Sequence, residues 1–249
     1  MTPLIKYLLH LADNTLILSQ RNSEWCGHGP VLEQDIAITN ISLDLLGQAR
    51  NLYSYAATLI GGEATEDSLA YLRKEREFRN CLLVEQPNGD WAQTILRQYC
   101  FSQYQYALYQ ELLNSKDPQL AAIVEKSIKE VAYHLRWSSE WVIRLGDGTE
   151  ESHRRMLKAI EELWAYTGEL FEAADYEKDL QQEGIAADLE KIKQEWQLKT
   201  EAIFAEATLP MPRNVFVQTG GKQGIHTEQL GFILTELQYM QRAYPGAKW

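Results

Sequence analysis

Apolar residues recur three and four positions apart over most of the chain, which predicts a series of amphipathic helices. The longest are expected over residues 3–21, 31–60, 91–113 and 117–145, and each is long enough to be an element of a helical bundle. Asp117 followed by Pro118 marks a helix start, because aspartate caps the first turn and proline there gives up no N–H that the helix needs. Gly146 and Gly148 are expected to end that helix in a left-handed cap.

Shorter helices are expected between and after these long segments. Thr65 is expected to cap a helix that reaches about Asn80, and Asp90 and Thr149 to cap the helices 91–113 and 149–173. Further helices are expected over residues 176–185, 189–208 and 227–244. We therefore predict one all-α domain over residues 1–249, with a core bundle over about 3–145 and additional helices over about 149–249.

Each of the four long segments has an interruption near the middle of its apolar seam. These positions are Thr15, Gln48, Ser102 and the pair Val131/His134. In ferritin-like bundles that hold two irons, two helices each supply a Glu and the other two each supply a Glu-x-x-His, because positions i and i+3 share one helix face.

Here the histidine of such a pair is present as His134, but Val131 stands where the glutamate belongs. Leu45 likewise stands three residues before Gln48. Gln48 is either part of a buried hydrogen-bond network, a relic of a ligand position, or a glutamine at the bundle surface. We interpret Leu45, Gln48, Ser102, Val131 and His134 as the positions of a degenerate metal site, and we expect no metal in this chain.

A literal Glu-x-x-His occurs at Glu150 and His153. It lies in the first turn of a predicted helix, where acidic residues are favoured by the helix dipole. We interpret it as part of a helix start and not as a metal ligand pair.

The net charge is −11, which argues against nonspecific binding to nucleic acid or to an anionic membrane. No apolar run approaches the ~20 residues that a membrane span requires. The three cysteines are odd in number and lack C-x-x-C spacing, so reduced thiols are expected. These features predict a cytoplasmic protein.

A local basic cluster stands out in this acidic chain. Within seven residues, and interleaved with two glutamates, it contains Arg73, Lys74, Arg76 and Arg79. The cluster either binds phosphate groups, with which guanidinium forms paired hydrogen bonds, or is a solvated helix face with Glu–Arg pairs.

Several motifs together resemble one known family, the C subunits of bacterial phenylacetyl-CoA epoxidases. The motifs are L-I-L-S-Q-R (16–21), E-W-C-G-H (24–28), L-D-L-L-G-Q-A-R-N (43–51), L-L-V-E-Q-P-N-G (82–89), D-P-Q-L-A-A-I (117–123), I-K-E-x-x-Y-H-L-R (128–136) and T-G-G-K-x-G-x-H-T-E-x-L-G (219–231). The resemblance covers essentially the whole chain and keeps its spacing.

The resemblance implies a ferritin-like fold and a non-catalytic, structural role in a monooxygenase complex of phenylacetate degradation. In such a complex a related catalytic A subunit holds a di-iron centre and epoxidises the ring of phenylacetyl-CoA. A reductase with FAD and an iron–sulfur cluster supplies electrons from NADPH. The A subunit motifs D-E-A-G-H and K-E-E-S-F-H correspond here to D-L-L-G-Q and K-E-V-A-Y-H, so Leu45, Gln48 and Val131 replace ligands.

The resemblance also implies contact with the CoA ester. The expected residues are Arg76, Glu77, Phe78, Arg79 and Asn80, with a second and weaker group at Lys178, Asp179 and Leu180. Two other functions remain open at this point, a di-iron oxidase active on its own and an all-helical adaptor unrelated to oxygenases.

Overall fold

The computed structural model describes residues 1–247, which fold into α-helices and short 3-10 helices without any β-strand. The all-α prediction is therefore confirmed. The chain divides into two compact units, one built from residues 1–87 and the C-terminal stretch from Thr219, the other from residues 88–218. The prediction of a single domain stays a prediction.

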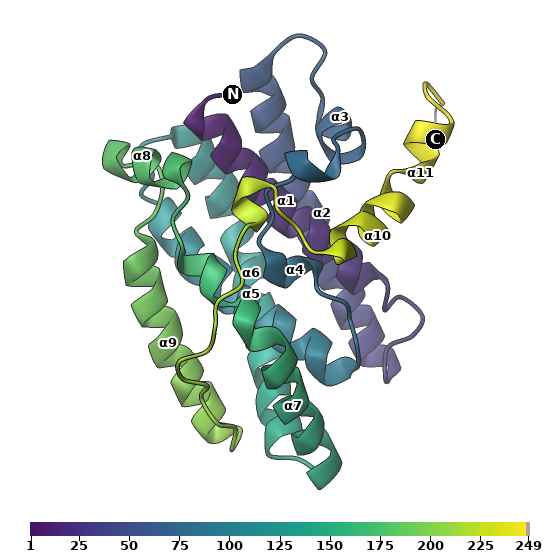
Figure 1. The fold of residues 1–249 in the computed structure, drawn as a ribbon, viewed down its shortest axis with the longest axis vertical. Helices are drawn as coiled ribbons and strands as arrows, with labels where there is room; N and C mark the ends of the chain where they lie inside the picture. The colour runs from purple at the N-terminus through teal and green to yellow at the C-terminus, as the bar shows by residue number, and fades with distance from the viewer. Residues whose placement is uncertain (248–249) are drawn as a thin grey trace. The chain divides into compact units, whose positions relative to one another are not determined.

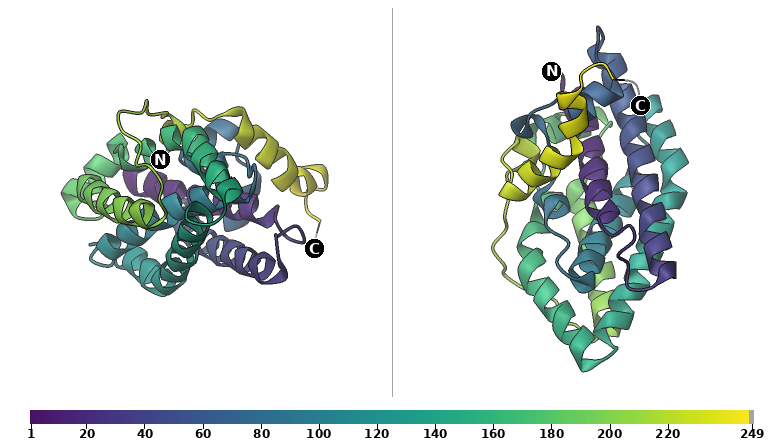
Figure 2. Two further views of the ribbon diagram at one scale, coloured as in Figure 1. Left: turned by 90° about the horizontal axis from the view of Figure 1, so that it is seen from below. Right: turned by 90° about the vertical axis from the view of Figure 1, so that its right-hand side faces the viewer.

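Unit 1 is built on two long helices, α1 (Pro3–Ser23) and α2 (Leu32–Ile60), which pack side by side (Figures 1 and 2). Its shorter elements come from both ends of the chain. They are α3 (Glu66–Tyr71), η1 (Glu75–Glu77), α4 (Leu82–Glu85), η4 (Gly221–Gln223), α10 (Glu228–Leu237) and α11 (Tyr239–Ala243). Helix α10 contacts α1, η1 and α4, so the end of the chain closes this unit.

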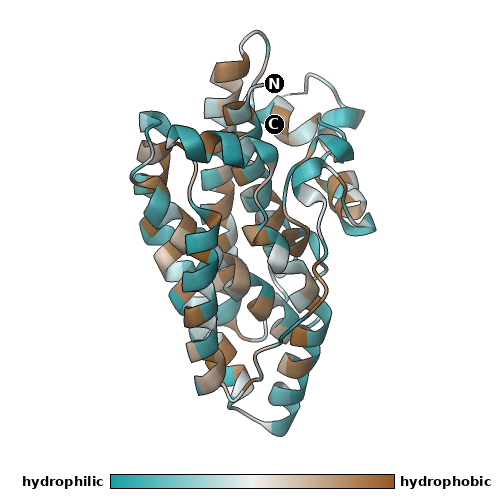
Figure 3. Cartoon of the chain, turned by 60° about the vertical axis from the view of Figure 1, so that its left-hand side comes forward, coloured by the Kyte–Doolittle hydropathy of each residue, from teal (hydrophilic) through white to brown (hydrophobic). Residues whose placement is uncertain are grey.

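Unit 2 is built on α5 (Trp91–Leu112) and α6 (Pro118–Gly146), which also pack against each other. Helix α7 (Glu150–Leu163) contacts both of them, as does α9 (Leu189–Glu206). The connecting elements are η2 (Trp164–Tyr166), η3 (Gly168–Phe171) and α8 (Asp175–Glu183). Figure 3 shows hydrophobic and hydrophilic residues alternating along the long helices of the chain, as the spacing of apolar residues predicts.

The predicted helix starts are confirmed at four positions. The Asp117 carboxylate accepts a hydrogen bond of 2.8 Å from the Leu120 N–H, and Asp90 accepts from the N–H groups of Ala92 and Gln93. The hydroxyls of Thr65 and Thr149 accept from the N–H groups three residues on. Side-chain caps of this kind satisfy N–H groups that have no partner inside the helix.

Three expected helix boundaries are wrong. The helix from Thr65 ends at Tyr71 instead of Asn80, because the Arg73 side chain turns into the interior and the chain continues as the short helix η1. The helix from Thr149 ends at Leu163 and is followed by two 3-10 helices. The last helix is divided at Gln238, and α4 was not expected.

Gly146 is the last residue of α6 and does not have a positive φ, so the expected left-handed cap is also wrong. The structure gives a different reason for a glycine here. A Cβ at position 146 would lie 2.4 Å from the carbonyl oxygen of Ala207. Glycine therefore allows α6 and the end of α9 to approach closely.

None of the helices in residues 1–247 combines the length and the apolarity that a membrane crossing requires.

Candidate functional site

The five positions that the sequence analysis interprets as a degenerate metal site are all buried. Leu45 and Gln48 lie on α2 in unit 1, while Ser102 on α5 and Val131 and His134 on α6 lie in unit 2. Gln48 is 1 % exposed, which excludes the interpretation of a glutamine at the bundle surface.

The residues at these positions do not fit a pair of iron ions. Leu45 and Val131 present only hydrocarbon, and neither is exposed. The hydroxyl of Ser102 accepts a hydrogen bond of 2.8 Å from the side-chain amide of Gln98. Iron centres of this class use several carboxylates together with histidine, whereas the five positions supply one histidine and no carboxylate. Within residues 1–247, no group of three or more His, Cys, Asp or Glu side chains is arranged to hold a metal ion.

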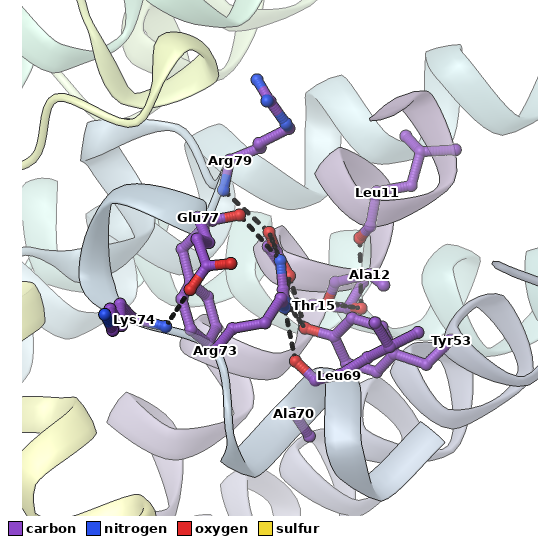
Figure 4. A network of polar contacts seen from close by, with 12 residues as sticks. Leu11, Ala12, Thr15, Tyr53, Leu69, Ala70, Arg73, Lys74, Glu77 and Arg79 are labelled. Carbon is purple, nitrogen blue, oxygen red and sulfur yellow. Dashed lines mark hydrogen bonds and ion pairs between the residues drawn. The ribbon is translucent and has the colours of Figure 1, made fainter. Parts of the chain in front are cut away.

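The interruption at Thr15 has a local explanation. Its hydroxyl donates to the carbonyl oxygens of Ala12, at 3.0 Å, and Leu11, at 3.2 Å, on the preceding turn of α1 (Figure 4). Ser138 on α6 does the same toward the carbonyl of His134, at 2.7 Å. A hydroxyl can thus be buried in a seam because its own helix supplies the acceptor.

The literal Glu-x-x-His also has a structural explanation. The Nδ1 of His153 donates to the carbonyl oxygen of Gly146 at 2.7 Å. This carbonyl is at the C-terminal end of α6, where helix carbonyls lack partners within the helix. His153 therefore joins the start of α7 to the end of α6.

The basic cluster begins with a residue that is not available to a ligand. Arg73 is buried and its guanidinium forms a paired interaction with the carboxylate of Asp13 on α1. Asp13 also accepts from the Tyr53 hydroxyl, at 2.5 Å, and from the Arg79 backbone N–H, at 2.7 Å. We call these four residues the Asp13 network; Figure 4 shows Arg73 pointing toward Tyr53, Leu69 and Glu77.

The charges of this network stabilise one another. Burial alone would lower the pKa of Arg73, but attraction to Asp13 and to Tyr53 outweighs it and raises the pKa above its ordinary value. Burial and the neighbouring Asp13 carboxylate raise the pKa of Tyr53. The Arg73 guanidinium lies over the Phe78 ring, 4.2 Å from its centroid, which adds a cation–π contact. The network therefore fixes the segment 75–80 to α1 and α2.

The predicted CoA-contacting residues of this segment divide into two groups. Arg76 and Glu77 are exposed, while Phe78 and Asn80 are wholly buried. Arg79 is partly buried, and its Nη1 donates to the carbonyl of Lys222 at 3.0 Å. The segment thus presents charged side chains to solvent and anchors itself by the residues between them.

Sequence reasoning missed a second buried carboxylate that binds the same segment. Glu85 is fully buried and accepts hydrogen bonds from Asn80 Nδ2, His226 Nδ1, and both the N–H and the hydroxyl of Thr227, at 2.7–2.9 Å. The other ring nitrogen, Nε2, lies 3.0 Å from the carbonyl oxygen of Phe78. We call Asn80, Glu85, His226 and Thr227 the Glu85 cluster.

Both neighbours of the His226 ring are acceptors, so both ring nitrogens donate and the imidazolium form is favoured. Burial lowers the pKa of His226, but the hydrogen bond and charge of Glu85, together with the Phe78 carbonyl, raise it, and the net shift is upward. Glu85, His226 and Thr227 all lie in two of the family motifs, L-L-V-E-Q-P-N-G and T-G-G-K-x-G-x-H-T-E-x-L-G. These motifs were the sequence signal that could have pointed to the cluster.

An open groove of about 660 Å³ lies beside η1 in unit 1. Its charged lining residues are Lys74, Glu75 and Arg242, and its other walls come from α10 and α11. Arg242 also donates to the backbone carbonyls of Leu72 and Arg73. The groove is therefore continuous with the exposed part of the basic cluster.

The second predicted group lies in unit 2, on α8. Lys178 is exposed and pairs with Asp175 of the same helix at 3.3 Å, Asp179 is exposed, and Leu180 is buried. Nothing in unit 2 brings a further basic side chain into contact with them among the ion pairs of the described residues.

Comparison with known proteins gives two findings. All 249 residues match the family described as phenylacetic acid catabolic protein. The chain is 53 % identical over 249 residues, which is 100 % of both chains, to the C subunit of the 1,2-phenylacetyl-CoA epoxidase of Escherichia coli strain K12. The resemblance found in the motifs and the ferritin-like fold class are thereby confirmed. On these grounds the chain belongs to the phenylacetic acid catabolic protein family.

Proposed function

We propose that this chain is the structural C subunit of a phenylacetyl-CoA 1,2-epoxidase complex in aerobic phenylacetate catabolism. It has no turnover of its own and pairs with a catalytic A subunit that carries the di-iron centre. Electrons reach that centre from a reductase with FAD and an iron–sulfur cluster. The full-length identity to a protein of that name supports this role.

The observation that supports the structural role is the kind of side chain at the expected ligand positions. Buried hydrocarbon at Leu45 and Val131 stands where the catalytic motifs have glutamates. A buried carboxylate needs a metal or other partners, so a protein that had lost its metal would be stabilised by apolar residues at these positions. The replacements are those expected of a subunit that keeps the fold and leaves the chemistry to its partner.

Metal analysis tests this proposal. We expect no stoichiometric iron in the chain purified alone, and about two irons per heterodimer after co-expression with the catalytic subunit. Tightly bound iron at about two per lone chain would overturn the structural role and favour a di-iron oxidase active on its own. Absence of any co-purifying di-iron subunit would favour an unrelated adaptor.

The segment 75–80 and the groove beside it are our proposed contact with the CoA portion of the substrate. Arg76 is exposed on η1, and Lys74 and Arg242 line the groove beside η1 together with Glu75. Three basic side chains therefore belong to this surface of an otherwise acidic chain. Phosphate groups of CoA are suitable partners for guanidinium. The Asp13 network and the Glu85 cluster hold this surface in place from beneath.

Charge reversal at Arg76 tests the contact. In the assembled complex, Arg76→Glu is expected to weaken phenylacetyl-CoA binding about tenfold, since one charged hydrogen bond to phosphate is lost. The control is Arg154→Glu, the same charge reversal at an exposed arginine of α7 in the other unit, which should leave the Kd unchanged. Equal affinity of the Arg76 variant and the wild type in a calorimetric titration would contradict the proposed contact.

A further inference from the structure

An aromatic cluster in unit 2 lines a pocket that the proposed function does not use. The ring centroids of Trp164 and Phe171 lie 5.7 Å and 5.3 Å from that of Trp196 on α9. A cavity of about 250 Å³ opens beside these rings, and its remaining walls come from α9, from η3 and from the stretch 211–217. Pockets for drug-sized ligands measure about 300–1,000 Å³, so this one suits a smaller molecule with a single ring.

The stretch 210–217 borders this pocket and is fixed only at its ends. The Leu209 N–H donates to the carbonyl of Phe204 at 2.8 Å, and the Gln218 N–H donates to the carbonyl of Ala165 at 2.8 Å. Within the described part of the chain, no backbone-to-backbone hydrogen bond involves the residues between these two anchors. A segment of this kind can move while its anchors stay in place, as in loops that close over ligands. We call residues 210–217 the flap.

The flap brings an aromatic ring to the pocket. Phe216 lines the cavity and is nevertheless 75 % exposed. The end of the flap lies close against η3, since a Cβ on Gly168 would be 2.6 Å from a methyl group of Val217. Aromatic surface is therefore present on the helical wall and on the flap, and a planar ring between the two gains contacts on both of its faces.

The charged residues of the lining are one lysine and one glutamate. Lys193 is half-buried, and among the described residues it forms no ion pair, whereas Lys191 of the same helix pairs with Glu111 at 2.6 Å. Glu172 is exposed and already has a partner within the chain. The charge that is available to a ligand is therefore the ammonium group of Lys193, which favours an anion.

The aromatic lining and the available ammonium group indicate one class of ligand. We propose that this pocket binds a small aromatic carboxylate, with its ring between the aromatic wall and Phe216 and its carboxylate at Lys193. The side-chain amides of Gln197 and Asn214 line the same pocket and are further hydrogen-bond donors. A CoA ester is too large for the cavity, and the proposed CoA contact belongs to unit 1, so the inference does not depend on the proposed function.

Calorimetric titration of the purified full-length chain with phenylacetate tests the site. We expect saturable binding of one phenylacetate per chain. Lys193→Gln should raise the Kd about tenfold or more, because it removes the charged partner of the carboxylate. The control is Lys199→Gln, which changes an exposed lysine on the same helix and should leave the Kd unchanged.

The charge and the ring of the ligand can be tested separately. Phenylacetamide has the same ring and no negative charge, so it should bind more weakly than phenylacetate and with the same Kd to the wild type and to Lys193→Gln. Phe216→Ala should raise the Kd of both compounds about fivefold, because one aromatic contact is lost. Phe232→Ala, at a similarly exposed phenylalanine of α10 in unit 1, should leave both values unchanged.

Four results would overturn the proposal. The first is a wild-type chain that shows no saturable binding of phenylacetate, and the second is an equal Kd for the wild type and Lys193→Gln. The third is a Phe216→Ala variant that binds both compounds as tightly as the wild type. The fourth is binding to the lone chain that disappears in the assembled epoxidase complex, because the pocket would then belong to an interface between subunits.

Discussion

At the scale of single residues, two buried carboxylates organise unit 1. Asp13 and Glu85 are fully buried, and each is surrounded by donors from segments that are distant in the sequence. A buried carboxylate with a full set of partners fixes geometry, whereas one that loses a partner is strongly destabilising. Both carboxylates bind the same short segment, residues 75–80, Asp13 through the Arg79 N–H and Glu85 through the Asn80 side chain.

The variant Asp13→Asn tests the first of these. It leaves the Arg73 guanidinium buried without its counter-charge, so we expect a loss of about 3–5 kcal/mol in the free energy of unfolding, measured in urea. The control is Glu151→Gln, which breaks exposed pairs with Arg154 and Arg155 and should change stability by less than about 0.5 kcal/mol. Equal effects of the two variants would mean that the Asp13 network adds nothing to stability.

His226 makes the contribution of the Glu85 cluster to the unfolding free energy depend on pH, and the raised pKa of His226 gives the direction. Its pKa in the folded chain is raised above 6.5, so its stabilising contribution is complete below pH 6.5 and is lost as the pH rises through the raised value. His226→Gln should remove this part of the pH dependence of the unfolding free energy. The control is His28→Gln, which changes an exposed histidine and should keep the part of the slope that His226 contributes. An identical slope in wild type and His226→Gln would show that the imidazole does not titrate as described.

At the scale of elements, the stretch from Gly220 to Thr227 acts as a strap over the segment 75–80. Glycine is required where the strap passes closest. A Cβ on Gly221 would lie 2.2 Å from the carbonyl oxygen of Asn80, and one on Gly224 would lie 2.3 Å from that of Arg76. The backbone of the strap therefore lies directly on the backbone of the segment, with no room for a side chain between them.

Two glycines allow this close approach to be measured. Gly27 and Gly224 both have φ near +80°, so alanine at either position is strained by the left-handed conformation. Around Gly27 there is open space, whereas a Cβ at Gly224 meets Arg76. Gly224→Ala should therefore lower the unfolding free energy by about 2 kcal/mol more than Gly27→Ala, because only its Cβ overlaps the carbonyl oxygen of Arg76. Thermal unfolding of the two variants side by side would show the difference, and equal values would contradict the close contact.

Local patterns predicted the long helices well and the short elements poorly, for a physical reason. Helices α1, α2, α5 and α6 repeat their apolar residues many times, and caps such as Asp117 mark their starts. The segment 65–80 shares the composition of a helix end, but the position of Arg73 is decided by Asp13, sixty residues away. No periodicity within the segment contains that information.

In the candidate site, too, features set by local spacing could be predicted and features set by distant contacts could not. That Leu45 and Val131 are buried in the seams of their helices could be predicted from the i, i+3 and i, i+4 spacing, since that spacing is local. Glu85 could not be singled out as a buried carboxylate, because its donors His226 and Thr227 follow about 140 residues later. Only the shared motifs indicated that both stretches matter, and they did not show that the two meet.

At the scale of the whole molecule, chain connectivity is the dominant feature. Unit 1 begins at the N-terminus, is interrupted by unit 2 from residue 88 to 218, and is completed by the stretch from Thr219. Helices α1 and α2 follow each other in the sequence and can pair early. In contrast, α4 and η1 contact α10, which comes near the C-terminal end of the chain. Contacts of such large sequence separation form late in folding.

This order of completion has a consequence during protein synthesis. While the ribosome is still adding unit 2, Glu85 is already present, but Thr227 and His226 have not been made. A message truncated before codon 226 gives a product whose Glu85 lacks these donors. Such a product also lacks the contacts of α10 with α1, α4 and η1, so we expect it to be degraded faster than the full-length chain in a pulse-chase experiment.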